Sequence, residues 1–427
     1  MKSLNNIKIL LVVLVISFAA TPLSAQFTIT GEIRPRAEFR NGFKSLTTDN
    51  TDAAFFIEQR SRLYLGYTDT KYSFQLTLQD VRLWGENSQI FKNDNSLFNV
   101  FEAWGAYHFN DKFKLKVGRQ ALDYDNARIL GNLAWAQQAR SHDLLKFEYK
   151  SNDFSLHFGA AFNQEDVLSR PEPARLASTF YNGINNYKTI QYLWLNKKYE
   201  KGNTSFLFLN NGIQAPDSVV NFSQTAGIYS KDDFGTVDLS AELYYQFGKT
   251  GNGADLSGLM AALFINFDLG KTNLGIGGDY LTGTDPGSAE SSSFTPLYGT
   301  NHKFYGLMDY FYVGNPSGDV GLIDVYLNAK FGLSDKSALN IALHRFNSQV
   351  DLTEQFAAES NTLGTEIDLV YNLNIDKAVN LKIGYSQMFA DSNMELIKTG
   401  DSNATNNWAW AMLTIKPKLF ESKKNDN

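Results

Sequence analysis

Apolar and polar side chains alternate along much of the chain with a period of two residues. From residue 27 to residue 40 the odd positions are mostly apolar, and the even positions carry polar or charged side chains. Successive side chains of a β-strand point to opposite faces of a sheet, so this segment predicts a strand with one apolar and one charged face. Pro35 lies inside it, where we expect a bulge or a missing ladder hydrogen bond.

The predicted strands are long. Segments 55–67, 237–247, 363–373 and 408–420 each extend over at least eleven residues. Strands of soluble proteins have about 5–6 residues, whereas strands that cross a membrane as part of a barrel need about 9–11. Aromatic residues near the predicted strand ends, such as Trp408 and Trp410, suit the girdles of such a barrel at the membrane interfaces.

Short and long connections alternate between these strands. Short polar turns are expected near residues 70, 111, 152, 201, 233, 271, 335 and 376. Longer irregular stretches are expected at 44–54, 85–99, 121–142, 163–187, 212–222, 249–255, 282–318, 347–361 and 391–406. Outer-membrane barrels combine short periplasmic turns with longer extracellular loops. The sequence therefore predicts an all-β fold, a transmembrane antiparallel barrel of eighteen strands with both termini in the periplasm.

The N-terminal segment 1–25 has the features of a cleaved signal peptide. Lys2 and Lys8 precede an apolar run from Ile9 to Ala20, which is too short to span a bilayer as a helix of roughly 20 residues. We expect cleavage near Ala25 and a barrel over residues 26–427, in the outer membrane of a Gram-negative bacterium.

Composition excludes several classes of function. The chain of 427 residues has no Cys, which rules out thiol catalysis and thiolate metal sites. Its net charge of −6 argues against nucleic-acid binding, which normally requires a basic surface. The five histidines form no recognisable catalytic or metal-binding motif, and His302 is expected to pack against Tyr305. The glycine run 275–278 lacks the last glycine of a dinucleotide-binding loop. Taken together, these features predict no cofactor, no metal and no enzymatic activity.

Several segments resemble the alginate-export family of outer-membrane barrels. They are GEIRPRAEFRNGF (31–43), QRSRLYLGY (59–67), DVRLWG (80–85), GRQALDYDNARILGNLAWAQQARSHDLLKFEY (118–149) and FTPLYGTNHKFYGLMDYF (294–311). The resemblance implies an eighteen-stranded channel that passes an anionic polysaccharide, and it assigns channel-lining or constricting roles to Arg119, Arg128 and Arg140. Arg82 is a further candidate, although the alternation of its strand changes at Asp80.

The inward faces predict the chemistry of the channel. Alternation places Arg34, Arg36, Arg40, Arg60 and Arg62 in the lumen, and rings of Arg and Lys favour anions in a pore. Later strands place acidic residues inward, opposed mainly by Lys330 and Lys382, so the lumen is not uniformly basic. These acidic residues are Asp238, Glu242, Asp279, Asp324, Glu366 and Asp368.

These observations predict a passive channel for an anionic oligosaccharide, polysaccharide or similar solute, embedded in outer-membrane lipid. Its anion path would contain Arg34, Arg36, Arg60, Arg62, Arg82, Arg119, Arg128 and Arg140. A general nutrient porin remains an alternative, as does a structural or adhesion barrel with a plugged lumen. In a purely structural interpretation, the inward charges only pair with each other across neighbouring strands of the wall. Direction of transport and any periplasmic partner stay open.

Overall fold

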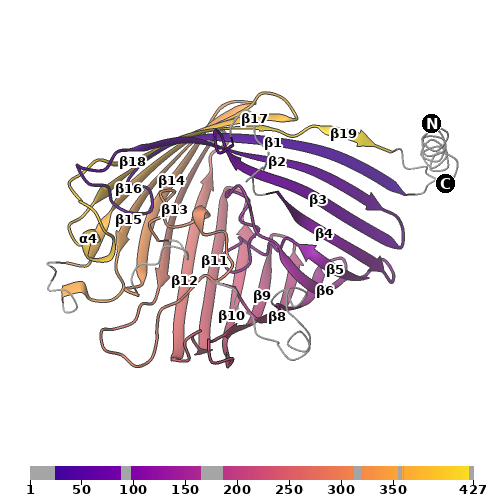
Figure 1. Ribbon diagram of the computed structural model, residues 1–427, viewed down its shortest axis with the longest axis horizontal. Coiled ribbons are helices and arrows are strands. Elements are labelled where there is room, and N and C mark those ends of the chain that lie inside the picture. The colour runs from indigo at the N-terminus through magenta and orange to yellow at the C-terminus, as the bar shows by residue number, and fades with distance from the viewer. Residues whose placement is uncertain are drawn as a thin grey trace.

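Eighteen antiparallel strands close into a barrel in the computed structural model, which describes residues 25–87, 98–164, 186–311, 319–353, 358 and 360–422. Each strand pairs with its neighbours in sequence, and β1 pairs with both β2 and β18 (Figure 1). Closure leaves no free sheet edge, so the backbone hydrogen bonds are made between strands, as a lipid environment requires. The predicted signal peptide, residues 1–25, lies outside the described residues except for Ala25.

The strand bounds follow the predicted pattern closely. The strands are β1 (Gln26–Asn41), β2 (Ala54–Thr68), β3 (Tyr72–Leu83), β4 (Asn99–His108), β5 (Phe113–Gln120), β6 (His142–Lys150), β7 (Phe154–Phe162), β8 (Thr189–Tyr199), β9 (Gly202–Gln214), β10 (Val220–Asp233), β11 (Val237–Lys249), β12 (Asp255–Asp268), β13 (Thr272–Leu281), β14 (Leu322–Ser334), β15 (Ser337–Asn347), β16 (Thr362–Asn374), β17 (Val379–Ala390), β18 (Asn406–Ile415) and β19 (Lys418–Glu421). All eight short turns lie where they were expected. The loop expected at 212–222 is shorter, because β9 and β10 leave only residues 215–219 between them.

The last predicted strand, 408–420, is interrupted. Strand β18 ends at Ile415 and β19 begins at Lys418, and both pair with β1. Pro417 lies between them and has no N–H to donate to a ladder, although its carbonyl accepts a hydrogen bond of 3.2 Å from the Gly31 N–H. At Pro35 the pairing with β2 is continuous, while the ladder to β18 lacks partners for residues 34 and 35. The gap in the ladder that was expected at Pro35 is therefore observed, on the side of β18.

The outer surface of the barrel carries the apolar half of each alternating strand. Leu243 is 53% exposed and Leu263 is 48% exposed, which is what a side chain facing lipid requires. The same holds for Ile33, Phe74, Val117, Leu145, Ile276, Val325, Leu327 and Ile383.

The packed core of the protein lies inside the barrel. It forms where two long loops fold against the inner wall, and it contains Trp408 and Trp410, which are 0% and 5% exposed. The interfacial girdle position expected for these two residues is therefore wrong, because both side chains point inward from β18. Two short helices lie outside the sheet, η2 (Asn301–Lys303) and α4 (Met394–Ile397). Among the residues described, no helix is long and apolar enough to cross a bilayer.

Candidate functional site

Two loops meet in the lumen of the barrel. The crossing loop (residues 121–141) joins β5 to β6, and the second loop (residues 282–311) follows β13. They are joined by a parallel bridge between Leu130 and Tyr298 and by the hydrogen bond from the Gly131 N–H to the Tyr298 carbonyl, 2.9 Å long. Because the loops contact each other and the wall, they decide how much of the lumen remains open.

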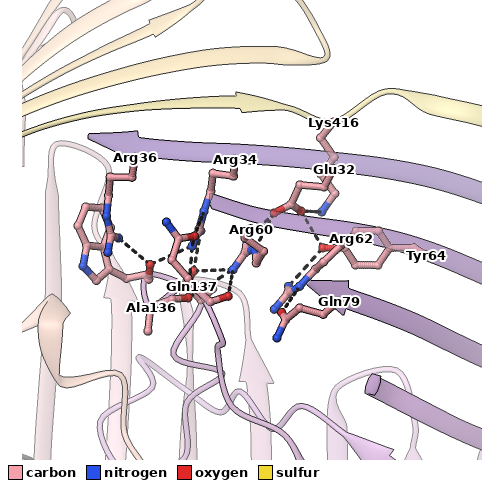
Figure 2. Close-up of polar contacts among 12 residues, drawn as sticks. Glu32, Arg34, Arg36, Arg60, Arg62, Tyr64, Gln79, Ala136, Gln137 and Lys416 are labelled. Atoms are coloured by element: carbon pink, nitrogen blue, oxygen red, sulfur yellow. Dashed lines mark hydrogen bonds and ion pairs between the residues drawn. The ribbon is translucent and has the colours of Figure 1, made fainter. Parts of the chain in front are cut away.

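Arginines of β1 and β2 bind residues 134–137 of the crossing loop (Figure 2). Arg34 donates to the carbonyl oxygens of Ala134 and Trp135 at 2.7 and 3.0 Å, and to the Gln137 side chain at 2.9 Å. Arg60 donates to the Ala134 carbonyl at 3.2 Å and pairs with Glu32 at 2.5 Å. Both guanidinium groups are buried, so they act as anchors of the loop backbone as well as charges in the wall.

Arg36 and Arg62 are the other two arginines of this wall. Arg36 donates to the Trp135 carbonyl at 3.0 Å and pairs with Glu38 and Glu58. Arg62 donates to Gln79 at 2.6 Å and lies over the Phe101 ring at 3.8 Å. Its Nη2 atom is buried and finds no hydrogen-bond partner in the described part of the chain. The wall therefore contains both arginines that pair with a carboxylate and arginines that form no ion pair within the described ranges.

Arg128, in the first half of the crossing loop, fixes the loop to the opposite wall of the barrel. Its guanidinium group pairs with Glu242 of β11 at 2.9 Å and with Asp279 of β13 at 3.0 Å, and it donates to the Tyr305 hydroxyl at 2.8 Å. Burial lowers the pKa of Arg128, but the charges of Asp279 and Glu242 outweigh this effect and raise the pKa well above its usual value. The crossing loop thus spans the lumen, from the basic wall at β1 and β2 to the acidic wall at β11 and β13.

The second loop is held by acidic residues of β16. The Met308 N–H donates to Glu366 at 2.8 Å, and the Leu307 N–H donates to Asp368 at 3.3 Å. Gly306 has φ +80°, and a Cβ there would lie 2.6 Å from the Glu366 carboxylate, so only glycine fits this approach. The predicted acidic wall is therefore used by the fold, as the binding surface for loop N–H groups and for Arg128.

Aromatic rings fill the space between the crossing loop and β18. The Trp135 ring stacks on His302 at 4.4 Å and contacts the ring of Trp410 at 4.8 Å. The Nδ1–H group of His302 donates a hydrogen bond of 2.8 Å to the Asp309 carboxylate. The expected packing of His302 against Tyr305 is replaced by this stack.

The remaining predicted path residues lie in different places. Arg140 is half-buried on the crossing loop, where it donates to the Gly299 carbonyl at 3.0 Å, and burial lowers its pKa. Arg82 and Arg119 occupy the outer face of the barrel, which differs from the lumen position expected for them. Arg119 is 43% exposed and pairs with Asp143 at 2.7 Å.

The position of Arg82 follows from its strand register. Strand β3 pairs with β2 without a shift, and Arg82 lies opposite the outward residue Gln59. The change of alternation expected at Asp80 does not occur, since Asp80 stays on the outer face and pairs with Arg82 at 2.6 Å. The register irregularity of β3 lies instead between Thr77 and Leu78, opposite β4.

The inward carboxylates and the inward cations differ in their contacts. Some carboxylates, such as Glu102 and Asp238, are held by hydrogen bonds from neutral groups rather than by a cation. All eleven inward carboxylates accept a hydrogen bond or an ion pair; they are Glu32, Glu38, Glu58, Glu102, Glu148, Asp238, Glu242, Asp279, Asp324, Glu366 and Asp368. Six inward cations make no ion pair with a carboxylate of the described residues; they are Arg34, Arg62, Lys116, Lys231, Lys330 and Lys382. Within the described part of the chain, no group of three or more His, Asp or Glu side chains could hold a metal ion.

The comparisons with known proteins agree with this architecture. The model of a family described as alginate export matches residues 25–409. The chain belongs to the alginate export family. Its members are outer-membrane channels of Gram-negative bacteria, so this alginate-export chain is a passive channel rather than an enzyme. No curated protein matches the sequence.

Solved structures with the same fold as this alginate-export protein share little sequence with it. OccAB4 from Acinetobacter baumannii is 12% identical, with a TM-score of 0.64 over 93% of this chain and 99% of that chain. OpdK from Pseudomonas aeruginosa, solved with vanillate, is 8% identical, with a TM-score of 0.61 over 91% and 98%. A BenF-like porin from Pseudomonas fluorescens Pf-5 is 12% identical, with a TM-score of 0.61 over 92% and 99%. At these identities the likeness shows the barrel fold alone.

The residue pattern did not predict the inward folding of the two loops, although the family resemblance gave Arg128 and Arg140 of the crossing loop channel-lining or constricting roles. Both loops were expected as extracellular connections, yet they bury Leu130, Tyr305, Met308 and Tyr310 almost completely. Large apolar side chains stabilise a fold only when they are buried. A solvent-exposed loop would therefore not contain so many of them. The apolar content of segments 121–141 and 294–311 was therefore a usable signal.

Proposed function

We propose that this channel passes anionic solutes, with carboxylate-bearing oligosaccharides or small organic acids as the substrate class. The observation that carries the proposal is the group of six inward cations that make no ion pair with a carboxylate of the described residues. The eleven inward carboxylates named above each accept a hydrogen bond or form an ion pair, whereas these six cations have no carboxylate partner among the described residues. Uncompensated positive charge in a narrow pore with low-dielectric walls raises the local concentration of anions.

In this proposal the arginines of the basic wall have two roles. Arg34 and Arg62 add uncompensated charge, and Arg34, Arg36 and Arg60 hold the crossing loop through its carbonyl oxygens. Arg128 positions the same loop from the acidic wall, although its own charge is neutralised. The solved neighbour OpdK was crystallised with vanillate, an aromatic carboxylate, which supports a small acid as one member of the class.

The proposal is tested by the reversal potential of single channels in a KCl gradient. The wild-type channel should prefer chloride at low salt. A triple Lys231→Gln, Lys330→Gln and Lys382→Gln variant should lose much of this preference. The difference should shrink at 1 M salt, where the Debye length is about 3 Å and the wall charges are screened.

A matched control removes the same charge outside the lumen. Lys112, Lys201 and Lys377 lie in short turns at the end of the barrel, and their replacement by Gln should leave the reversal potential close to that of the wild type. Equal shifts for the two triple variants would contradict a lumen field. An unselective wild-type channel would favour a general porin, and a silent barrel would favour a plugged lumen.

A further inference from the structure

A cavity of about 670 Å³ lies below the two loops, against the wall formed by β10 to β16. Lys303 and Tyr305 of the second loop and Arg128 of the crossing loop cover it, and the lining residues Lys231 and Asn273 lie close to the short turns. Its volume falls within the roughly 300–1,000 Å³ of small-molecule binding sites. The cavity is therefore large enough to hold a solute as well as water.

Two aromatic rings form an apolar platform in this cavity. The rings of Phe264 and Tyr326 are stacked, with centroids 5.9 Å apart and planes inclined by 21°. They lie over two glycines of β13, because a Cβ at Gly275 would come within 2.5 Å of Phe264 and a Cβ at Gly277 within 2.3 Å of Tyr326. The glycine run that does not form a dinucleotide loop thus lets both rings lie flat against the wall.

Cations and polar side chains surround the platform. Lys231, Lys303 and Lys330 line the cavity with exposed side chains, and none pairs with a carboxylate of the described residues. Asp238, a carboxylate that also lines the cavity, makes no ion pair with the described residues and accepts a hydrogen bond of 3.2 Å from Asn266. Of the other acidic residues that line the cavity, Glu242 and Asp279 pair with Arg128, and Asp368 is bound by the second loop and by Ser386.

Asn328 supplies an unused hydrogen-bond acceptor in the same cavity. Its Oδ1 atom is buried and makes no hydrogen bond with the described residues. An unpaired buried acceptor costs about 1–3 kcal/mol, so a rotation of the Asn328 amide that turns Oδ1 into the cavity, toward a ligand hydroxyl, would be favoured. Aromatic platform, cations and this acceptor are three different contacts, and together they select a particular ligand chemistry.

We propose that this cavity is a binding subsite for a six-membered ring that carries one carboxylate and at least one hydroxyl. The ring face would lie on Phe264 and Tyr326, the carboxylate near Lys330, and a hydroxyl would donate to Asn328 Oδ1. A sugar acid and a hydroxylated benzoate share this chemistry. The inference rests on the proposed function, since Lys330 also contributes to the anion-attracting charge, but it adds a specific site to a general field.

The subsite is tested by solute-induced interruptions of the current through single inserted channels, with galacturonate and 4-hydroxybenzoate as the ring acids. Acetate supplies a carboxylate without a ring, and galactose supplies the ring without a carboxylate. At least one ring acid should bind, and acetate and galactose should bind much more weakly. The ring acid that binds identifies the source, and binding of both supports the shared chemistry.

Matched variants separate the site from the field. Lys330→Gln should weaken binding about fivefold, the size of a partly solvated ion pair, and Phe264→Leu should weaken it through loss of the platform. Lys382→Gln removes the same lumen charge outside this cavity and should change binding little. Only inserted channels of wild-type conductance are scored, so misfolded protein does not contribute.

The result that overturns the subsite is equal binding of acetate and the ring acids, equal weakening by Lys330→Gln and Lys382→Gln, or no binding of either ring acid. These outcomes differ from failure of the proposed function, which appears as a wild-type channel without chloride preference in KCl alone. A chloride-selective channel that does not distinguish ring acids would keep the function and remove the subsite.

Discussion

At the scale of single residues, the barrel places adjacent side chains in two different solvents. Leu263 faces outward and is 48% exposed, whereas its neighbour Ala262 lines the cavity inside the barrel. The same alternation separates the outward Ile33 from the inward Arg34. The stability effect of a substitution should therefore depend on the parity of its position as much as on its chemistry.

A pair of identical substitutions tests this dependence. Leu263→Arg should reduce the free energy of unfolding by about 2–4 kcal/mol, because the new charge lies in hydrocarbon. Ala262→Arg should cost much less, since the same side chain enters the aqueous lumen. Chemical denaturation of the barrel in lipid vesicles measures both values, and equal losses would mean that the assigned faces are wrong.

The ion pairs made by Arg128 and Arg119, two arginines of segment 118–149, should also differ in their contribution to stability. Arg128→Gln should cost about 3–5 kcal/mol, because it leaves Glu242 and Asp279 buried without their cation. Arg119 lies next to the last residue of β5, at the end of the barrel that carries the long loops. Its pair with Asp143, whose members are 43% and 55% exposed, is therefore near water, and Arg119→Gln should cost about 0–1 kcal/mol. Unfolding in denaturant compares the two variants, and a large loss for Arg119→Gln would contradict its outward position.

At the scale of elements, the main feature is that charged side chains of the strands hold backbone groups of the loops. Arginines of β1 and β2 bind carbonyl oxygens of the crossing loop, and acidic residues of β16 bind N–H groups of the second loop. Hydrogen bonds to charged groups contribute about 1.5–3 kcal/mol each, which is more than neutral ones contribute. The basic wall thus binds C=O groups of one loop, and the acidic wall binds N–H groups of the other.

Release of the crossing loop should widen the channel. Arg34→Gln removes the donors to Ala134 and Trp135, so the single-channel conductance should rise. Arg40→Gln is the matched control, because Arg40 is also inward but pairs with Glu38 and makes no hydrogen bond with the described crossing loop. Equal conductance of the two variants would show that the loop stays in place without its anchor.

At the scale of the whole molecule, the alternation of turns and loops assigns an orientation in the membrane. Residues 286–290 of the second loop are exposed and lie at the end of the barrel that carries the long loops. Residues 335 and 336 form the short turn between β14 and β15 at the other end. The two sites should therefore lie on opposite sides of the outer membrane.

Epitope insertion checks this orientation. A tag between residues 287 and 288 should be labelled on intact cells, whereas a tag between 335 and 336 should be labelled only after the outer membrane is permeabilised. Labelling of the second tag on intact cells would reverse the topology. The permeabilised sample also shows that both tagged proteins are present.

The sequence alone determined the barrel, because a strand alternates its side chains with a fixed period and a membrane sets a minimum strand length. These two local rules placed Arg34 and Arg60 inward, Ile33 and Leu63 outward, and the eight short turns correctly. They also led to the strand number, which needs only a count of connections. Family membership followed from continuous segments of the chain.

Only the tertiary structure decided what the inward charges do. Whether Arg34 faces open water or the carbonyl of Ala134 depends on a contact across 100 positions of the chain, which no local pattern encodes. The same applies to Arg128 with Glu242 and Asp279, and to Trp408, whose aromatic chemistry suits a membrane girdle and a packed lumen equally well. Faces follow from local backbone geometry, whereas partners depend on where distant loops fold.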